Sequence, residues 1–171
     1  YDSVLRVNPQ DSLAVSEAVI NVIRSYKRDL EASPSDQIIV QTMVSKVVAS
    51  GVVLTLDLTT GAPYYVINYD DETGRTDTVT SGGEYSNRTL YVQRGEADAL
   101  RSPRWRALVK AVAEIEEKTQ QDSLDIEFAI DEAMQVHILQ VRPITTTRNW
   151  SKDIALRVND TVAQIKKHIR K

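Results

Sequence analysis

Four polar side chains near the end of the chain have the types and spacing suited to binding a metal–phosphate ligand. Two short runs, LDIEFAI (residues 124–130) and VHILQVR (residues 136–142), alternate as the two strands of a hairpin do. Alternation places one polar set on a single face: Asp125, Glu127, Gln140 and Arg142. Carboxylate and amide oxygens are ligands of hard cations such as Mg²⁺, and a guanidinium binds phosphate. The pattern therefore indicates a site for a metal–nucleoside triphosphate.

A turn centred between residues 133 and 134 sets the register that we expect for this hairpin, because a slip of one residue would mix its faces. The expected opposite pairs are Asp125–Arg142, Ile126–Val141, Glu127–Gln140 and Phe128–Leu139. His137 is expected on the apolar face, as a packed histidine rather than a catalytic one. On spacing alone, the preferred interpretation is simpler: a polar sheet face in water with a cross-strand Asp–Arg pair.

Composition excludes several other kinds of site. The chain has 171 residues, of which 42% are hydrophobic and 26% charged, as in an ordinary globular protein. It has no cysteine, so disulfides, thiolate nucleophiles and Cys-ligated zinc are excluded, and two histidines make a multi-His metal cluster improbable. A net charge of -3 argues against nucleic acid as a partner. No apolar run is long enough for a membrane span, and we expect a cytoplasmic protein.

The elements that must position these residues follow from periodicity and end signals. We expect a helix capped by Asp11 or Ser12 and running to about Glu31, and a second helix capped by Ser102 with Pro103 in its first turn and running to about Thr119. The expected strands are 37–44, 51–58, 64–70, a short one near 75–80, 90–93 and the two strands of the hairpin. A last helix is expected from about Trp150 to Arg170. Helices mixed with hairpins predict an α+β fold with a largely antiparallel sheet and flanking helices.

Two sequence blocks resemble one known family. DIEFA (125–129) followed by LQVRPIT (139–145) is similar to the end of the ATP-binding domain of phosphoenolpyruvate synthase and pyruvate phosphate dikinase. VQTMV (40–44) followed by SGVVLTLD (50–57) and Thr60-Gly61 is similar to an earlier part of the same domain. The resemblance covers about residues 11–145, with the blocks in the family's order.

The resemblance implies an ATP-grasp lobe that binds ATP and Mg²⁺. Glu127 and Gln140 match the family's magnesium ligands, Arg142 its phosphate-contacting arginine, and Asp125 a nearby acidic residue. The resemblance also implies contacts with the cofactor earlier in the chain. Gln41, Met43 and Val44 would lie on a strand whose backbone meets the adenine. Thr55 and Asp57 would lie on the strand that lines the cleft.

The resemblance also leaves parts of the family's pattern unmatched. Leu58 stands where the family usually has proline, and the segments carrying the first-lobe lysine and arginine are not visible. We therefore expect residues 1–148 to be the C-terminal part of an ATP-grasp domain from a longer enzyme, and residues 149–171 to be a helical linker or docking helix. The implied activity is phosphoryl transfer from ATP, through a histidine on another domain, to pyruvate or another acceptor.

Three alternatives stay open. One is a kinase of the same family that acts on an amide such as glutamine. Another is a nucleotide-binding module without turnover. The third is an assembly domain, or a homo-oligomer, that uses the apolar stripe of the last helix.

Overall fold

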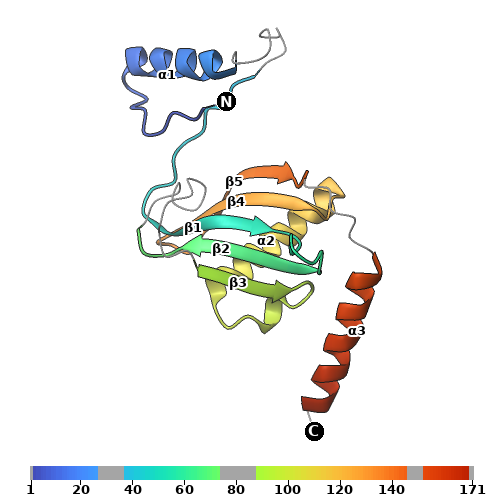
Figure 1. Cartoon of the computed structure of the whole chain (residues 1–171). Helices are drawn as coiled ribbons and strands as arrows, with labels where there is room; N and C mark the ends of the chain where they lie inside the picture. The colour runs from blue at the N-terminus through green and yellow to red at the C-terminus, as the bar shows by residue number, and fades with distance from the viewer. Residues whose placement is uncertain (1, 27–36, 74–87, 146–151, 170–171) are drawn as a thin grey trace. The chain divides into compact units, whose positions relative to one another are not determined.

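The computed structural model describes residues 2–26, 37–73, 88–145 and 152–169, with side-chain detail in the last segment from residue 156 onward (Figure 1). The chain divides into two units, Tyr1–Met43 and Val44–Lys171, which we describe separately.

The second unit is built on one antiparallel sheet with strand order β3-β2-β1-β4-β5. Its strands are β1 (Val47–Leu54), β2 (Tyr64–Asp70), β3 (Arg88–Gln93), β4 (Leu124–Asp131) and β5 (Val136–Pro143). A short 3-10 helix, Ala97–Ala99, follows β3. The structure thus confirms an α+β fold with helices and an antiparallel sheet, and it confirms the predicted strand 64–70.

Helix α2 (Pro103–Thr119) covers one face of this sheet (Figure 1). Ser102 is its N-cap and Pro103 opens it, as the local signals predicted, because proline has no N–H to leave unpaired in the first turn. The buried side of α2 is made of Trp105, Leu108, Val109 and Val112. These side chains pack with the alternate apolar residues of the strands, including Phe128 and Ile67, which are fully buried. The opposite face of the sheet carries Asp125 and Glu127 of β4 beside the apolar Val52 and Leu54 of β1.

The second strand was predicted at 51–58, but β1 spans Val47–Leu54. The strand begins earlier because residues 47–50 find partners on β4, and Ser50 also pairs with β2. It ends earlier because the backbone N–H of Thr55 and that of Asp57 already bond outside the ladder, to Leu124 and Ala62. The predicted strand near 75–80 lies outside the described residues.

The first unit contains α1 (Ser12–Ser25) and an extended segment. Asp11 caps the helix, and its side chain accepts hydrogen bonds from the backbone N–H groups of Leu13 and Ala14. The helix was expected to continue to about Glu31, but it ends at Ser25, and residues 27–36 lie outside the described part of the chain.

The strand predicted at 37–44 is wrong. Residues 37–45 have no strand pairing in the structure, and the side chains of Ile39 and Val40 are 86% and 79% exposed. A run of β-branched residues favours an extended backbone, but a strand also needs a partner for its N–H and C=O groups. Gln41, Met43 and Val44 therefore do not lie on a strand.

Helix α3 (Lys152–Ile169) confirms the core of the last predicted helix, whose expected ends lie outside the described residues. Ile165 and Ile169 of its predicted apolar stripe are 51% and 78% exposed. Near its C-terminal end, Lys166 forms an ion pair with Glu96 at 2.7 Å.

Candidate functional site

Strands β4 and β5 bring the four predicted site residues together on the face of the sheet away from α2. Asp125 lies opposite Arg142, and Glu127 lies opposite Gln140, which confirms the expected register at these positions. Directly opposite residues of an antiparallel pair project to the same face. The metal-type ligands and the guanidinium therefore share one surface.

A β-bulge alters the register toward the turn. The pairing shifts between Glu127 and Phe128, so that Phe128 lies opposite Ile138 instead of Leu139. The extra residue reverses the faces that follow it. His137 then lies opposite Ala129 on the polar face, and its predicted place on the apolar face is wrong.

Arg142 lies against both carboxylates. Its Nη2 atom donates a hydrogen bond to Oδ2 of Asp125 at 2.8 Å and lies 3.6 Å from Oε1 of Glu127. The side chains of the two acids are each 23% exposed, whereas that of Arg142 is 49% exposed. One nitrogen of the guanidinium thus neutralises a pair of half-buried carboxylates.

The environment of Glu127 disfavours its negative charge. Burial raises the pKa of the Glu127 carboxyl above its usual value, the neighbouring charge of Asp125 raises it further, and Arg142 opposes both. Val52 lies directly beside Glu127 on β1, and its alkyl side chain takes the place of water there. The nearby guanidinium therefore does not fully offset the cost of burying this charge.

The oxygen donors fit a hard cation. Oδ1 of Asp125 is buried and accepts no hydrogen bond from any residue that the structure describes, although carboxylate oxygens in proteins are normally paired. Asp125, Glu127 and Gln140 together offer carboxylate and amide oxygens, the donor set that Mg²⁺ takes alongside substrate phosphates and water. Within the described ranges, no group of three or more His, Cys, Asp or Glu residues is placed to hold a metal by itself. The two carboxylates and the amide are therefore the oxygen donors with which this face could bind Mg²⁺.

The tertiary structure adds residues to this face that the sequence analysis missed. The register of β1 and β2 places Asn68, Val52, Glu127 and Gln140 in one cross-strand row. A neighbouring row contains Val66, Leu54, Asp125 and Arg142. Extending the period-2 alternation across β1 would have found Val52 and Leu54, because alternation assigns them the face opposite to the buried Val53.

Thr55 and Asp57, expected on a strand beside the cleft, follow β1 instead. The Thr55 hydroxyl is fully buried; it donates to the carbonyl of Asp122 and accepts from the N–H of Leu124. Oδ1 of Asp57 accepts a hydrogen bond from the N–H of Thr59 at 2.7 Å. Both side chains thus stabilise local backbone, and their contact with nucleotide stays a prediction, as does that of Gln41, Met43 and Val44.

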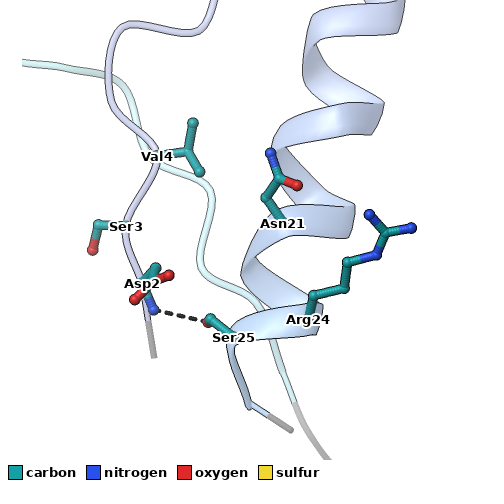
Figure 2. Close-up of a pocket in the computed structure, with 6 residues that line it drawn as sticks. All are labelled: Asp2, Ser3, Val4, Asn21, Arg24 and Ser25. Carbon is teal, nitrogen blue, oxygen red and sulfur yellow. Dashed lines mark hydrogen bonds between the residues drawn. The ribbon is translucent and has the colours of Figure 1, made fainter. Parts of the chain in front are cut away.

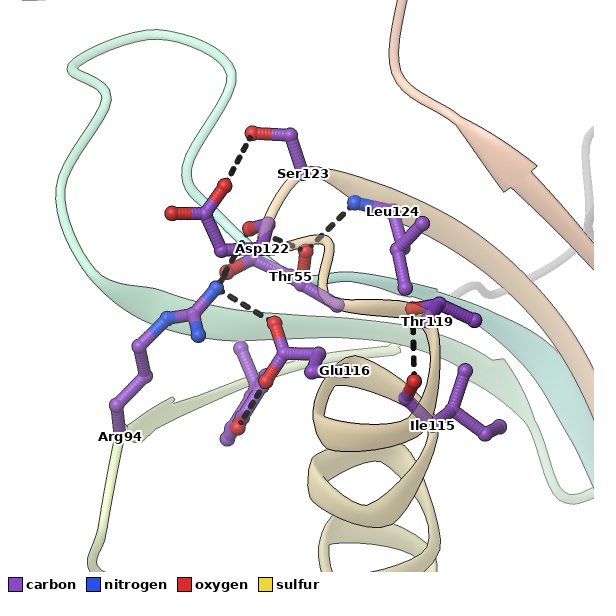
Figure 3. Close-up of polar contacts among 9 residues, drawn as sticks. Thr55, Arg94, Ile115, Glu116, Thr119, Asp122, Ser123 and Leu124 are labelled. Carbon is purple, nitrogen blue, oxygen red and sulfur yellow. Dashed lines mark hydrogen bonds and ion pairs between the residues drawn. The ribbon is translucent and has the colours of Figure 1, made fainter.

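Arg94, which the sequence did not single out, joins the ends of β1, α2 and β4 (Figure 3). Its Nη2 atom donates to the carbonyl oxygens of Thr55 and Asp122 at 2.5 and 2.7 Å and forms an ion pair with Glu116 at 2.7 Å. The other carboxylate oxygen of Glu116 accepts from the Tyr65 hydroxyl at 2.6 Å. Burial and this hydrogen bond raise the pKa of the Tyr65 hydroxyl. The cluster fixes the backbone from which β4 starts.

Replacing Arg94 with methionine should lower the free energy of unfolding by about 1.5–3 kcal/mol, because the largely buried Glu116 carboxylate loses its ion-pair partner. Urea denaturation of Arg94→Met, Glu116→Gln and the double variant measures the coupling. We expect the double variant to lose less than the two single losses added together. Strictly additive losses would show that the two side chains act independently.

His137 and Asp131 form a second polar pair beside the hairpin turn. Nε2 of His137 lies 2.8 Å from Oδ2 of Asp131, and Oδ1 of Asp131 accepts from the N–H of Gln135 at 2.9 Å. The hydrogen bond with His137, and then that from Gln135, hold the pKa of Asp131 below its usual value. The pair anchors the turn that sets the hairpin register.

Because the pKa of Asp131 is lowered in the folded protein, its ionised form stabilises the fold above the ordinary aspartate pKa of about 3.9. That contribution is lost as the pH falls through the lowered value. Asp131→Asn should therefore reduce the melting temperature at pH 7, and the difference from wild type should shrink toward pH 3. Thermal unfolding followed at both pH values checks this. An equal loss at both would contradict a role for the charge.

A hollow of about 500 Å³ lies in the first unit (Figure 2). It is bordered by Asp2, Ser3, Val4, Asn21, Arg24 and Ser25. Asp2 is held there by a hydrogen bond from its N–H to Oγ of Ser25 at 2.8 Å. Most of these residues are exposed, so the hollow is a surface depression rather than an enclosed site.

No protein-family model matches this chain, and no curated protein is significantly similar to it. In the described part of the chain, no helix has both the length and the apolar composition required to cross a bilayer. The geometry of the β4–β5 face and the sequence blocks that form it are therefore the features of this chain that point to a function.

Proposed function

We propose that the polar face of β4 and β5 binds Mg-ATP. The observation that carries this proposal is the Asp125–Arg142 and Glu127–Gln140 pairing, which puts two half-buried carboxylates, an amide and a guanidinium on one face. An ordinary surface pair would leave its carboxylates in water. Here burial disfavours the charge of Glu127, and none of the described residues donates to Oδ1 of Asp125.

Each residue has a role in this proposal. Glu127 and Gln140 hold the metal, and Asp125 supports it from the adjacent row. Mg²⁺, when bound, neutralises phosphate charge. Arg142 orients the phosphate chain and stabilises negative charge that develops on it, since phosphoryl transfer depends mainly on positioning and electrostatics. Val52 and Leu54 lie beside the acids and limit water around them.

The resemblance to phosphoenolpyruvate synthase and pyruvate phosphate dikinase supports a wider proposal. In it, this chain is the ATP-grasp lobe of a phosphotransferase that passes phosphate through a histidine on another domain. His137 is unsuited to that role, since its ring is already bonded to Asp131 beside the hairpin turn. Pyruvate and an amide such as glutamine are the two acceptors that we propose to compare.

Titration of Mg-ATP into the ¹⁵N-labelled chain tests the binding proposal, because NMR shifts detect even millimolar affinity. We expect the amide signals of β4 and β5 to shift with Mg-ATP and to shift much less with ATP in EDTA. The proposal would be rejected if no magnesium-dependent shift appeared at a Mg-ATP concentration about tenfold above a roughly millimolar Kd. That result would favour a polar face without a ligand.

A further inference from the structure

The Arg142 guanidinium has two tasks that it cannot perform at once. In the structure its Nη2 atom bridges Asp125 and Glu127, at 2.8 Å and 3.6 Å. In the proposed function the same group faces a phosphate. The carboxylates that it neutralises are those that would face the metal.

We propose that Arg142 stands in for the metal ion, and that a divalent cation bound at Glu127 and Gln140, beside Asp125, releases the guanidinium toward the phosphate groups. This inference rests on the proposed function and adds to it an order of events and a coupling between two ligands. The bridging position supports it, because one cationic nitrogen lies within ion-pair distance of a carboxylate oxygen from each acid.

The position of Arg142 in the fold allows such a release. Among the described strands, β5 is the last of the sheet and pairs with β4 alone, so its other edge forms no strand pairing with them. The Arg142 side chain is 49% exposed, whereas the two acids are 23% exposed. The arginine can therefore turn outward while the acids, on the inner strand β4, stay in place.

The acids cannot satisfy both cations in full. A divalent ion beside a guanidinium is repelled by it, and each weakens the other's hold on the carboxylates. Once the metal is bound, the guanidinium loses its partners and gains a phosphate. Metal and phosphate should therefore bind cooperatively, and each should tighten the other by the same factor.

The test uses two simple probes, Mg²⁺ alone and inorganic tripolyphosphate, with wild type and Arg142→Gln. Removing the competing charge should tighten binding of Mg²⁺ alone by roughly three- to tenfold, from the Coulomb energy across a few ångströms of partly hydrated protein. The same change should weaken binding of tripolyphosphate, measured in the presence of Mg²⁺, by about tenfold. The opposite signs are the diagnostic result, and NMR titration of the full chain measures both.

Arg88→Gln is a matched control. Arg88 also contacts two carboxylates, Asp71 at 3.1 Å and Glu72 at 2.7 Å, and its side chain is 52% exposed. It lies on β3, at the other edge of the sheet, so the variant makes the same change in net charge away from the site. We expect both affinities to be unchanged in Arg88→Gln. Arg142→Lys provides a second variant, which keeps the positive charge but lacks the planar guanidinium group with its several N–H donors. It should bind Mg²⁺ as weakly as wild type does.

The outcomes separate this inference from the function that it rests on. Suppose that wild type binds both probes, and that Arg142→Gln weakens both affinities or leaves Mg²⁺ binding unchanged. The proposed exchange of Arg142 for the metal ion is then overturned, while the proposed Mg-ATP site stands. If the two probes bind wild type without tightening each other, the coupling is overturned. If neither probe binds wild type or any variant, the proposed function fails together with the exchange.

Discussion

Glu127→Gln should reduce the affinity for Mg-ATP at least about tenfold while raising the thermal stability of the ligand-free protein at pH 7. The loss of affinity follows from the loss of an anionic oxygen donor. The gain in stability follows because burial, together with Asp125, disfavours the ionised carboxyl despite the presence of Arg142. A residue that costs stability in order to bind a ligand is typical of a functional site.

The sign of the stability effect depends on pH in a defined way. The raised pKa of Glu127 means that its protonated form is compatible with the fold below the ordinary glutamate value of about 4.3. As the pH rises through the higher value in the folded protein, wild type loses stability that Glu127→Gln keeps. The two melting curves should therefore coincide near pH 4 and separate toward pH 7.

Glu132→Gln is the control for this experiment, since Glu132 lies just beyond β4, in the turn, and its side chain is 56% exposed. It pairs with Lys46 on the surface, where an ion pair contributes little. We expect Glu132→Gln to alter neither Mg-ATP affinity nor the pH dependence of melting. A Glu127→Gln variant that melts lower and binds Mg-ATP as wild type does would make Glu127 a structural residue.

Gly51→Ala should cost about 3 kcal/mol in the free energy of unfolding, at the upper end of the usual cost of overpacking a core. A Cβ at this position would lie 2.0 Å from the carbonyl oxygen of Asn68 and 2.8 Å from Cα of Tyr69. Both are backbone atoms of β2, so no side-chain rotation relieves the clash. Strands β1 and β2 would have to separate, and β1 also holds β4 in place.

Gly95→Ala separates crowding from backbone strain. Gly95 has a positive φ of 80°, and a Cβ there would meet no atom within 4 Å. The expected cost is about 1 kcal/mol, from the conformation alone. Guanidinium denaturation of both variants gives the comparison. A Gly51→Ala variant no less stable than Gly95→Ala would show that the central strands can move apart at little cost.

The sequence was most informative where structure depends on neighbours along the chain. Pro103 after Ser102 marked the start of α2, and the run of strand-type residues from Tyr64 to Asp70 marked β2 to the residue. Alternation put Asp125 and Glu127 on one face of β4, as the structure shows, but the expected pairing with Arg142 and Gln140 also needed the bulge, because the pairs next to the turn are shifted by one residue.

Other features required partners that no local pattern reveals. The run at 37–44 has strand-type residues but no strand in the structure, since pairing depends on an available edge. The bulge after Glu127 moved His137 to the polar face, where it bonds to Asp131. Arg94 gained its role from carbonyl groups at Thr55 and Asp122, each far from it in the chain.

By itself, the sequence determined the chemical character of the β4–β5 face, because backbone geometry alternates side chains with a period of two wherever a strand forms. Only the tertiary structure decided the electrostatic state of that face. Burial on an inner strand limits the hydration of Asp125 and Glu127, and the edge position of β5 leaves Arg142 half exposed beside them. Those two conditions depend on which strands lie next to one another, and they turn a pair of acids into a candidate metal–phosphate site.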